Sequence, residues 1–189
     1  MPEFDLSELV AAAARLQRQW EADEIPFCFI GGLAVSVWGQ SRQTNDVDAT
    51  VWTEFGNERP MIDRLLGGLK GRIEDADKFA LVNRVLLTQE SQGVDVDISL
   101  AAFPFERNLI QRAQLEPLRD EKLRVCGASD LIILKAFANR PHDWDDIRGI
   151  VVRSGTMLDW ELIESELTVL ANLKEEPEII ERILSFKDS

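Results

Sequence analysis

Two aspartates placed two residues apart, after a strand that ends in two glycines, constrain this chain more than any other feature. The apolar run 27–30 leads into Gly31 and Gly32. After thirteen further residues, a second apolar run carries Asp46 and Asp48. In a strand, residues at i and i+2 face the same side, about 6.5–7 Å apart along the chain. The pattern therefore predicts a sheet here, with two carboxylates on one face.

Carboxylates on one face repel each other unless a cation lies between them, and Mg²⁺, which prefers oxygen ligands, is the usual cation. Glycines beside them let a phosphate group approach the backbone closely. A single Asp-x-Asp is also common on solvent-facing strands, and a Gly-Gly pair is usually a simple turn. The combination of the two, in this order, is what predicts a metal and nucleotide site.

A second acidic doublet, Asp95 and Asp97, alternates with apolar residues in the run 94–101. These acids also share one face of a strand. If that strand lies beside 46–53, three or four carboxylates converge. Two metal ions about 4 Å apart, bridged by such acids, form the clamp used for in-line nucleotidyl transfer. The spacing leaves open whether Asp95 binds metal as well.

Composition excludes several other functions. The net charge of −13 opposes non-specific nucleic-acid binding, which needs a basic surface. His142 is the single histidine, so neither a Ser-His-Asp nor a Cys-His arrangement nor a zinc site is expected. Cys28 and Cys126 lie in apolar runs, which is typical of reduced core residues in a cytoplasmic protein. The chain lacks an apolar run of about 18 residues and starts with an acidic segment, so we expect neither a membrane span nor a signal peptide.

The hydrophobic periodicity predicts an α/β (α+β) fold, with a small mixed β-sheet, flanking helices and a helical C-terminal region. We expect a core over 1–127 and a helical region over 128–189 that packs on it. The expected helices are 6–21, 32–38, 59–69, 105–114, 129–139, 141–153, 159–173 and 177–186, and the expected strands are 27–30, 46–53, 84–89 and 94–101, with a hairpin over 116–126.

The segment 29–48 resembles the signature of the DNA polymerase β-like nucleotidyltransferase superfamily. Its form is Gly-Gly-x-Ala, then Gly39, then Arg-x-Thr-x-Asp-x-Asp at 42–48. This form is similar to the AbiEii-type toxin, or minimal nucleotidyltransferase, branch. Two later stretches, 96–106 and 130–147, resemble the strand with the third carboxylate and the helices that follow it in that branch.

The resemblance implies a set of metal ligands. Asp46 and Asp48 would bind two Mg²⁺ ions, with Mn²⁺ as an alternative metal. Asp97 would be the third carboxylate, which completes the catalytic metal site and helps to activate the acceptor. Asp95 matches less well, because the distance from Asp97 to the segment 104–106 fits the branch better.

The resemblance also implies residues that contact the nucleotide. Gly31 and Gly32 would hold the triphosphate with backbone amides at the start of the short helix. Arg42 would contact phosphate and Thr44 would brace the turn. From the residues alone, Arg42 is equally compatible with a purely structural role in the turn.

Two residues of the C-terminal third complete this set. Lys135 matches a family lysine near the nucleotide phosphates, and Asp146 matches a family acid in the same region. Lys135 lies in a strongly apolar helix, so it is also compatible with a lysine that simply extends to the surface. Asp143, Asp145 and Asp146 stand near the start of a helix opened by Pro141, where acids favour the helix dipole.

The implied activity is Mg²⁺-dependent transfer of an NMP from an NTP to a hydroxyl acceptor on RNA, protein or a small molecule. The resemblance adds a toxin-like role in a bacterial toxin–antitoxin or phage-defence system, with a cognate partner protein. Two other functions stay open: a non-catalytic nucleotide-binding antitoxin or regulator, and an enzyme that modifies a small molecule such as an antibiotic. The acidic charge favours the small molecule mildly. The residues identify neither the NTP, the acceptor nor the oligomeric state, and a homo-oligomer is among the open states.

Overall fold

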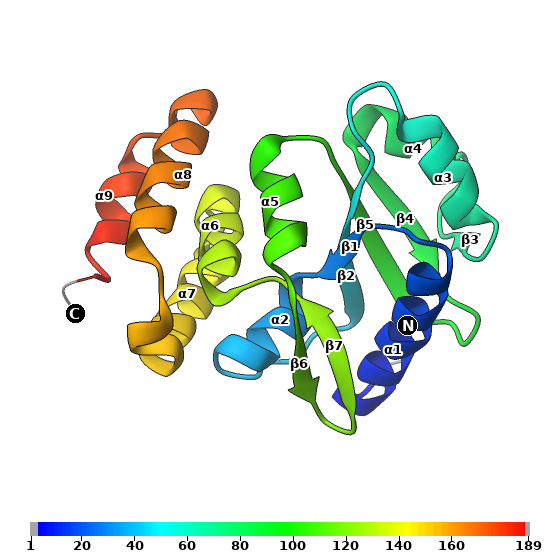
Figure 1. Cartoon of the computed structure of the whole chain (residues 1–189), viewed down its shortest axis with the longest axis horizontal. Coiled ribbons are helices and arrows are strands. Elements are labelled where there is room, and N and C mark those ends of the chain that lie inside the picture. Colours follow the sequence, from blue (N-terminus) through cyan, green and yellow to red (C-terminus); the bar gives the residue numbers. More distant parts are fainter. Residues whose placement is uncertain (1–3, 188–189) are drawn as a thin grey trace. The chain divides into compact units, whose positions relative to one another are not determined.

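The computed structural model describes residues 4–187 of the 189-residue chain, and within them seven strands form one mixed sheet (Figure 1). The strands lie in the order β3-β4-β5-β2-β1-β7-β6. Their bounds are β1 (Phe27–Phe29), β2 (Asp46–Trp52), β3 (Lys70–Gly71), β4 (Val85–Gln89), β5 (Asp95–Ala101), β6 (Gln114–Leu118) and β7 (Glu121–Val125). β2 pairs with β5 and β1 with β7 in parallel, and the other pairs are antiparallel. The expected mixed sheet is confirmed.

The neighbouring strands β2 and β5 bring the two acidic doublets side by side. Their parallel register sets Asp46 opposite Asp95 and Asp48 opposite Asp97. The apolar side chains between the acids, Val47 among them, are fully buried. Because side chains alternate along a strand, the four acids lie on the opposite face of the sheet. The expected adjacency of the two strands is therefore confirmed.

Helices of the sheet-containing part cover the sheet and connect its strands. Their bounds are α1 (Leu6–Ala22), α3 (Glu58–Leu66), α4 (Ala76–Asn83) and α5 (Pro104–Arg112). α1 begins with a capping box, in which the Asp5 and Glu8 side chains each accept a hydrogen bond from the other's backbone N–H. Its buried residues include Leu9, Ala13 and Leu16, and the helix packs against β2 and β7.

α5 determines which end of the acidic face is covered. It packs against β2, and the Arg107 guanidinium lies 5.7 Å from the centre of the Trp52 ring. Trp52 shares its face with Asp46 and Asp48, since the three are separated by even numbers of residues. α5 therefore covers the C-terminal end of this face, and the acids lie at the N-terminal end of β2.

The C-terminal third is helical, as expected. The bounds are α6 (Ala128–Ala138), α7 (Pro141–Ser154), the 3₁₀ turn η1 (Gly155–Met157), α8 (Trp160–Lys174) and α9 (Glu178–Leu184). α6 packs against α7, α8 and α9. Fully buried aliphatic side chains from three of these helices, Ile132, Ile147 and Ile163, belong to their shared core.

By their contacts, the described residues form two compact units. The first comprises the chain through Leu33 together with Gln43–Cys126, and the second comprises Ala34–Arg42 together with the chain from Gly127 onward. α2 (Gly31–Trp38) thus begins in the first unit and continues in the second. The expected boundary at 127 is close to this division, but nothing in the sequence indicates that 34–42 belongs with the helices. That the helical region packs on the core stays a prediction.

The segment between α3 and β4 differs most from the expectation. It contains β3 and α4, which the sequence does not predict, and α3 ends at Leu66 rather than at 69. β3 has two residues, too few for a periodic pattern. α4 leaves Phe79 and Val82 exposed instead of gathering its apolar residues on a buried face, so it lacks the helical periodicity that prediction relies on.

Two smaller expectations concern burial and membranes. Cys28 and Cys126 are both completely buried, as expected of core residues. Among residues 4–187, no helix combines the length and the apolar character needed to cross a membrane.

Candidate metal centre

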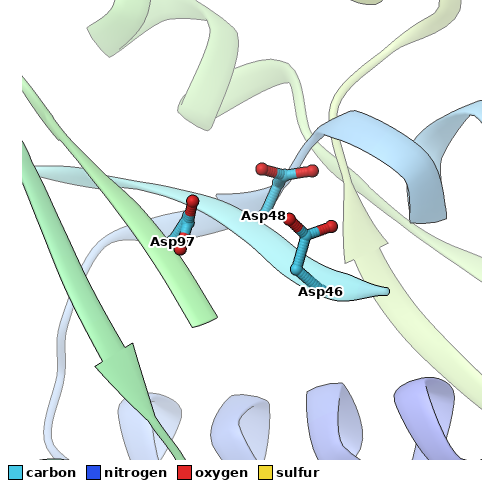
Figure 2. A group of neighbouring side chains, drawn as sticks. All are labelled: Asp46, Asp48 and Asp97. Atoms are coloured by element: carbon cyan, nitrogen blue, oxygen red, sulfur yellow. The ribbon is translucent and has the colours of Figure 1, made fainter. Parts of the chain in front are cut away.

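Three carboxylates converge on the acidic face of the sheet. Asp46 and Asp48 extend from β2 and Asp97 extends from β5, and Figure 2 shows the three side chains gathered on one side of these strands. One carboxylate oxygen of each residue lies within 4.8 Å of the other two. All three residues are half-buried. The structure thus brings together the three acids that the resemblance implies as metal ligands.

The donor set fits a hard divalent cation. Carboxylate oxygens are the ligands that Mg²⁺ and Mn²⁺ prefer. Oxygens on opposite sides of one Mg²⁺ lie about 4.2 Å apart, which is twice its usual bond length. Small side-chain rotations would therefore bring Asp46, Asp48 and Asp97 onto a shared ion from their present separation.

The first glycine of the pair is required by the position of Asp48. Gly31 has a φ of +57°, a left-handed conformation that side chains disfavour. A Cβ at Gly31 would also overlap the Asp48 carboxylate. The Gly32 N–H donates to Asp48 Oδ2 at 3.4 Å. Asp48 therefore lies against the backbone at the start of α2, where helix amides point outward and favour an anion.

The second glycine and the preceding turn hold Asp46. A Cβ at Gly32 would overlap the Thr44 side chain. The Thr44 hydroxyl donates to Asp46 Oδ1 at 3.1 Å. Thr44 thus braces one metal-ligand candidate, while the absence of a side chain at Gly32 makes room for the threonine. The two metal-ligand candidates on β2 are therefore positioned by direct contacts with Gly31, Gly32 and Thr44.

Arg72 is part of this site, although sequence reasoning did not find it. Its guanidinium makes ion pairs with Asp97 Oδ1 at 2.6 Å and with Asp95 Oδ2 at 2.8 Å. Burial raises the pKa of the Asp97 carboxyl, Arg72 opposes that effect, and the nearby charge of Asp46 adds to it. Asp95 is not among the three converging acids, and its two carboxylate oxygens bond to Arg72 and to Gln89.

The remaining predicted residues form a second cluster, within the helical unit. Lys135 Nζ contacts Asp143 Oδ1 at 3.0 Å and Asp146 Oδ2 at 2.7 Å, and the Arg42 Nε–H donates to Asp146 Oδ1 at 2.9 Å. Lys135 is only 5% exposed, so it does not extend to the surface. Arg140 also binds Asp143, at 2.7 Å. The structure therefore joins Arg42, Lys135 and Asp146 in one ion-pair network, and their contact with a nucleotide stays a prediction.

Both acids of this network are held in their charged form. Burial alone would raise the pKa of Asp143, but hydrogen bonds from Arg140 and Lys135 hold that pKa below its ordinary value. Burial opposes ionisation of Asp146 in the same way, and hydrogen bonds from Arg42 and Lys135 lower its pKa. Asp143 also accepts from the Arg140 backbone N–H, which caps α7. The position of Asp143 at a helix start predicts its role in capping the helix, but it does not predict that Asp143 is buried beside Lys135.

A family model described as "Nucleotidyltransferase of unknown function (DUF6036)" matches residues 5–187. The chain belongs to this family. The match confirms the nucleotidyltransferase family that the segment 29–48 led us to expect, and the AbiEii-type branch is a finer assignment that it does not address. No curated protein matches the chain in sequence.

Several solved structures have the same fold. An antigenic nucleotidyltransferase-like protein from Paracoccidioides brasiliensis is 13% identical, with a TM-score of 0.54 and 95% of each chain covered. The lincosamide antibiotic adenylyltransferase LnuA, solved with lincomycin bound, is 13% identical, with a TM-score of 0.53 over 79% of this chain and 98% of LnuA. ANT(2'')-Ia in complex with adenylyl-2''-tobramycin is 14% identical, with a TM-score of 0.53 over 87% of this chain and 98% of the other. At these identities the likeness establishes the polymerase β-like fold alone.

Proposed function

We propose that this protein transfers a nucleoside monophosphate from an NTP to a hydroxyl acceptor and releases pyrophosphate, with Mg²⁺ as cofactor. The observation that carries the proposal is the convergence of Asp46, Asp48 and Asp97 within 4.8 Å. Carboxylates that repel one another are held together more easily when a divalent cation joins them. Membership of a nucleotidyltransferase family supports this interpretation of the site.

In this proposal the three acids hold the metal, and the chain positions the nucleotide beside it. Bound Mg²⁺ would neutralise charge on the triphosphate and lower the pKa of the attacking hydroxyl. Gly31 and Gly32, which carry no side chains of their own, would let the triphosphate approach the backbone beside the Asp48 carboxylate at the start of α2. Thr44 fixes the orientation of Asp46 by its hydrogen bond. The contribution of the chain is mostly positioning and electrostatic stabilisation.

We extend the proposal to the helical unit by the resemblance. Arg42 and Lys135 would lie near the nucleotide phosphates, with Asp146 orienting both cations. The support is that these three residues, 93 positions apart between Arg42 and Lys135, contact one another through Asp146. A bidentate arginine–carboxylate pair and a buried lysine on the same acid give a fixed arrangement of charge.

The acceptor has two candidates. The resemblance to the AbiEii-type branch favours a toxin-like enzyme of a bacterial defence system, with a macromolecular acceptor and a cognate partner. A small-molecule acceptor is the second candidate, and the net charge of −13 favours it, since RNA would need a local basic surface. LnuA and ANT(2'')-Ia, which share the fold, are by their descriptions an antibiotic adenylyltransferase and an antibiotic-resistance factor.

Calorimetry with each of the four NTPs, with and without Mg²⁺, tests the proposal on the wild type and on Asp48→Asn. We expect one or more NTPs to bind only with Mg²⁺, and Asp48→Asn to weaken that binding at least tenfold. Asp63→Asn is the matched control, because it makes the same change of charge at an exposed side chain on α3. Mg²⁺-independent binding, or full binding by Asp48→Asn, would remove the metal assignment. Absence of binding under every condition would favour the non-catalytic partner protein.

A further inference from the structure

Arg72 reaches the acidic site from the edge of the sheet. It follows β3, and its backbone N–H donates to the Leu87 carbonyl at 3.0 Å, which ties it to β4. β4 separates β3 from β5 in the strand order. The Arg72 side chain therefore spans β4 to reach Asp95 and Asp97 on β5, and its starting point is fixed by the sheet.

The guanidinium links the two acids of the second doublet. One terminal nitrogen contacts Asp95 Oδ2 at 2.8 Å, and the other contacts Asp97 Oδ1 at 2.6 Å. The Gln89 amide donates to the second oxygen of Asp95 at 3.1 Å. Both Asp95 oxygens are thus bonded, whereas Arg72 bonds to one oxygen of Asp97. A planar fork of this kind can hold two carboxylates at once, which an ammonium group does less well.

Asp46 and Asp95 are the first acids of the two Asp-x-Asp doublets, but they have different surroundings. Asp46 and Asp95 face each other in the register of β2 and β5, yet Asp46 belongs to the converging ligands and Asp95 does not. The side chain of Asp95 is 13% exposed and that of Arg72 is 27% exposed, so water screens their attraction only in part. Asp95 therefore anchors the arginine, and the arginine in turn contacts the third ligand.

We propose that Arg72 is a positioning residue, which holds one oxygen of Asp97 and so sets both the orientation and the cation affinity of the third carboxylate. The inference rests on the proposed function and extends it to a residue of the chain outside the Asp-x-Asp motifs. Arg72 supplies a positive charge to Asp97 before any divalent ion binds. A cation must therefore compete with Arg72, and the metal site on its own is weaker than three carboxylates would make it. The triphosphate brings further oxygen ligands, so the metal binds most strongly together with the nucleotide.

Mn²⁺ affinity without nucleotide, measured by the loss of the free-ion signal in electron paramagnetic resonance, tests this inference independently of turnover. We expect Arg72→Met to bind Mn²⁺ about tenfold more tightly than wild type, because the ion then no longer competes with the guanidinium for the Asp97 carboxylate. Arg72→Lys retains the charge but lacks the planar fork, so it should bind Mn²⁺ about threefold more tightly than wild type, between wild type and Arg72→Met. Arg59→Met is the matched control, since it removes the same charge from a half-exposed side chain that pairs with Asp77.

A double-mutant cycle shows whether Arg72 acts through Asp97. In the Asp97→Asn background, we expect the effect of Arg72→Met to shrink from about tenfold to about twofold. A tenfold effect that persists there would show that Arg72 acts as a general charge, and this would overturn the positioning role. If wild type binds Mn²⁺ as tightly as Arg72→Met does, the inference about Arg72 is overturned but the proposed function is not. Absence of any Mn²⁺ binding that depends on Asp48 would overturn the proposed function, and the inference with it.

Discussion

The two acidic clusters of this chain balance their charge in different ways. In the helical unit, Asp143 and Asp146 are almost fully buried, and three cations, Lys135, Arg42 and Arg140, bond to these two acids. On the sheet, three half-buried acids converge on one another, and the pKa of one of them, Asp97, is raised by burial and by its acidic neighbours.

The charge arrangement of the helical cluster stabilises the fold, whereas that of the sheet cluster destabilises it. Bonded cations keep the acids of the helical unit charged, so removing a cation there leaves a buried charge without compensation. On the sheet, burial and the nearby charges of Asp46 and Asp95 raise the pKa of Asp97, so ionisation of this acid opposes folding at neutral pH. Acids retained in such an arrangement are expected to serve a ligand. The sheet cluster therefore has the charge arrangement that a divalent ion would complete, whereas the helical cluster is already balanced by cations of the chain.

The largest effect that this comparison predicts is on stability. Lys135→Met should lower the free energy of unfolding by about 3 kcal/mol, because it removes a buried partner of both Asp143 and Asp146. Urea unfolding measures the change. Lys187→Met, at a half-exposed lysine 3.8 Å from Glu164 in the same unit, should change it by less than about 1 kcal/mol. Equal losses in the two variants would break the comparison, since the buried network would then matter no more than a surface ion pair.

A medium effect should follow from changing the backbone of the sheet cluster. Gly31→Ala should cost about 2–3 kcal/mol, because it adds a Cβ at a φ of +57° and forces Asp48 to move. Displacement of Asp48 should also weaken Mn²⁺ binding at least tenfold. Gly56→Ala is the matched control: its φ is +84°, but the added Cβ would meet nothing within 4 Å, so we expect about 1 kcal/mol and unchanged Mn²⁺ binding. Unchanged Mn²⁺ binding in Gly31→Ala would show that the glycine does not shape the site.

The smallest effect is on pH dependence, and its sign differs between the clusters. The lowered pKa values of Asp143 and Asp146 stabilise the fold above the ordinary value of 3.8, and this contribution is lost as the pH falls through their lower folded values. The raised pKa of Asp97 acts in the opposite sense: its contribution is most favourable below 3.8 and is lost as the pH rises through the raised folded value.

Unfolding in urea and a metal chelator, from about pH 4 to pH 7, should therefore show Asp97→Asn gaining stability relative to wild type as the pH rises. The gain should lie in the window just above 3.8, since the asparagine does not titrate. A difference between the two proteins that stays constant with pH would mean that Asp97 is not strained by its neighbours.

Much of the sheet cluster could be predicted from the sequence because its signals are local. Alternation of acids and apolar residues in 46–52 and 95–101 fixes which side chains share a face, and two such strands need only be adjacent for Asp48 and Asp97 to meet. Gly31 was recognisable for the same reason, since it follows a buried strand directly. Most helices were also predictable, because they have a regular apolar face, although α4 was missed and α3 is shorter than expected.

Arg72 and Asp143 show what the sequence could not reveal. The partner of Arg72 depends on a two-residue strand at the sheet edge and on the register of two further strands. Such a short strand leaves no periodic signal. Asp143 stands at a helix start, where an acid needs no partner beyond the backbone, and its burial beside Lys135 follows from the packing of α6 on α7. Tertiary contacts of this kind have no local pattern.

The parallel pairing of β2 with β5 has a consequence for how the protein folds. Asp48 and Asp97 are direct partners although 49 positions separate them along the chain, and the intervening segment must form β3, α3, α4 and β4 on the way. Closing a loop of that length costs chain entropy before the contact is formed, and parallel strands cannot be joined by a tight hairpin. Topologies of this kind fold slowly compared with hairpins and helix pairs. The cluster of Asp46, Asp48 and Asp97 therefore exists only once β2 and β5 have paired, so the proposed divalent-ion site depends on the central strands of the sheet having come together.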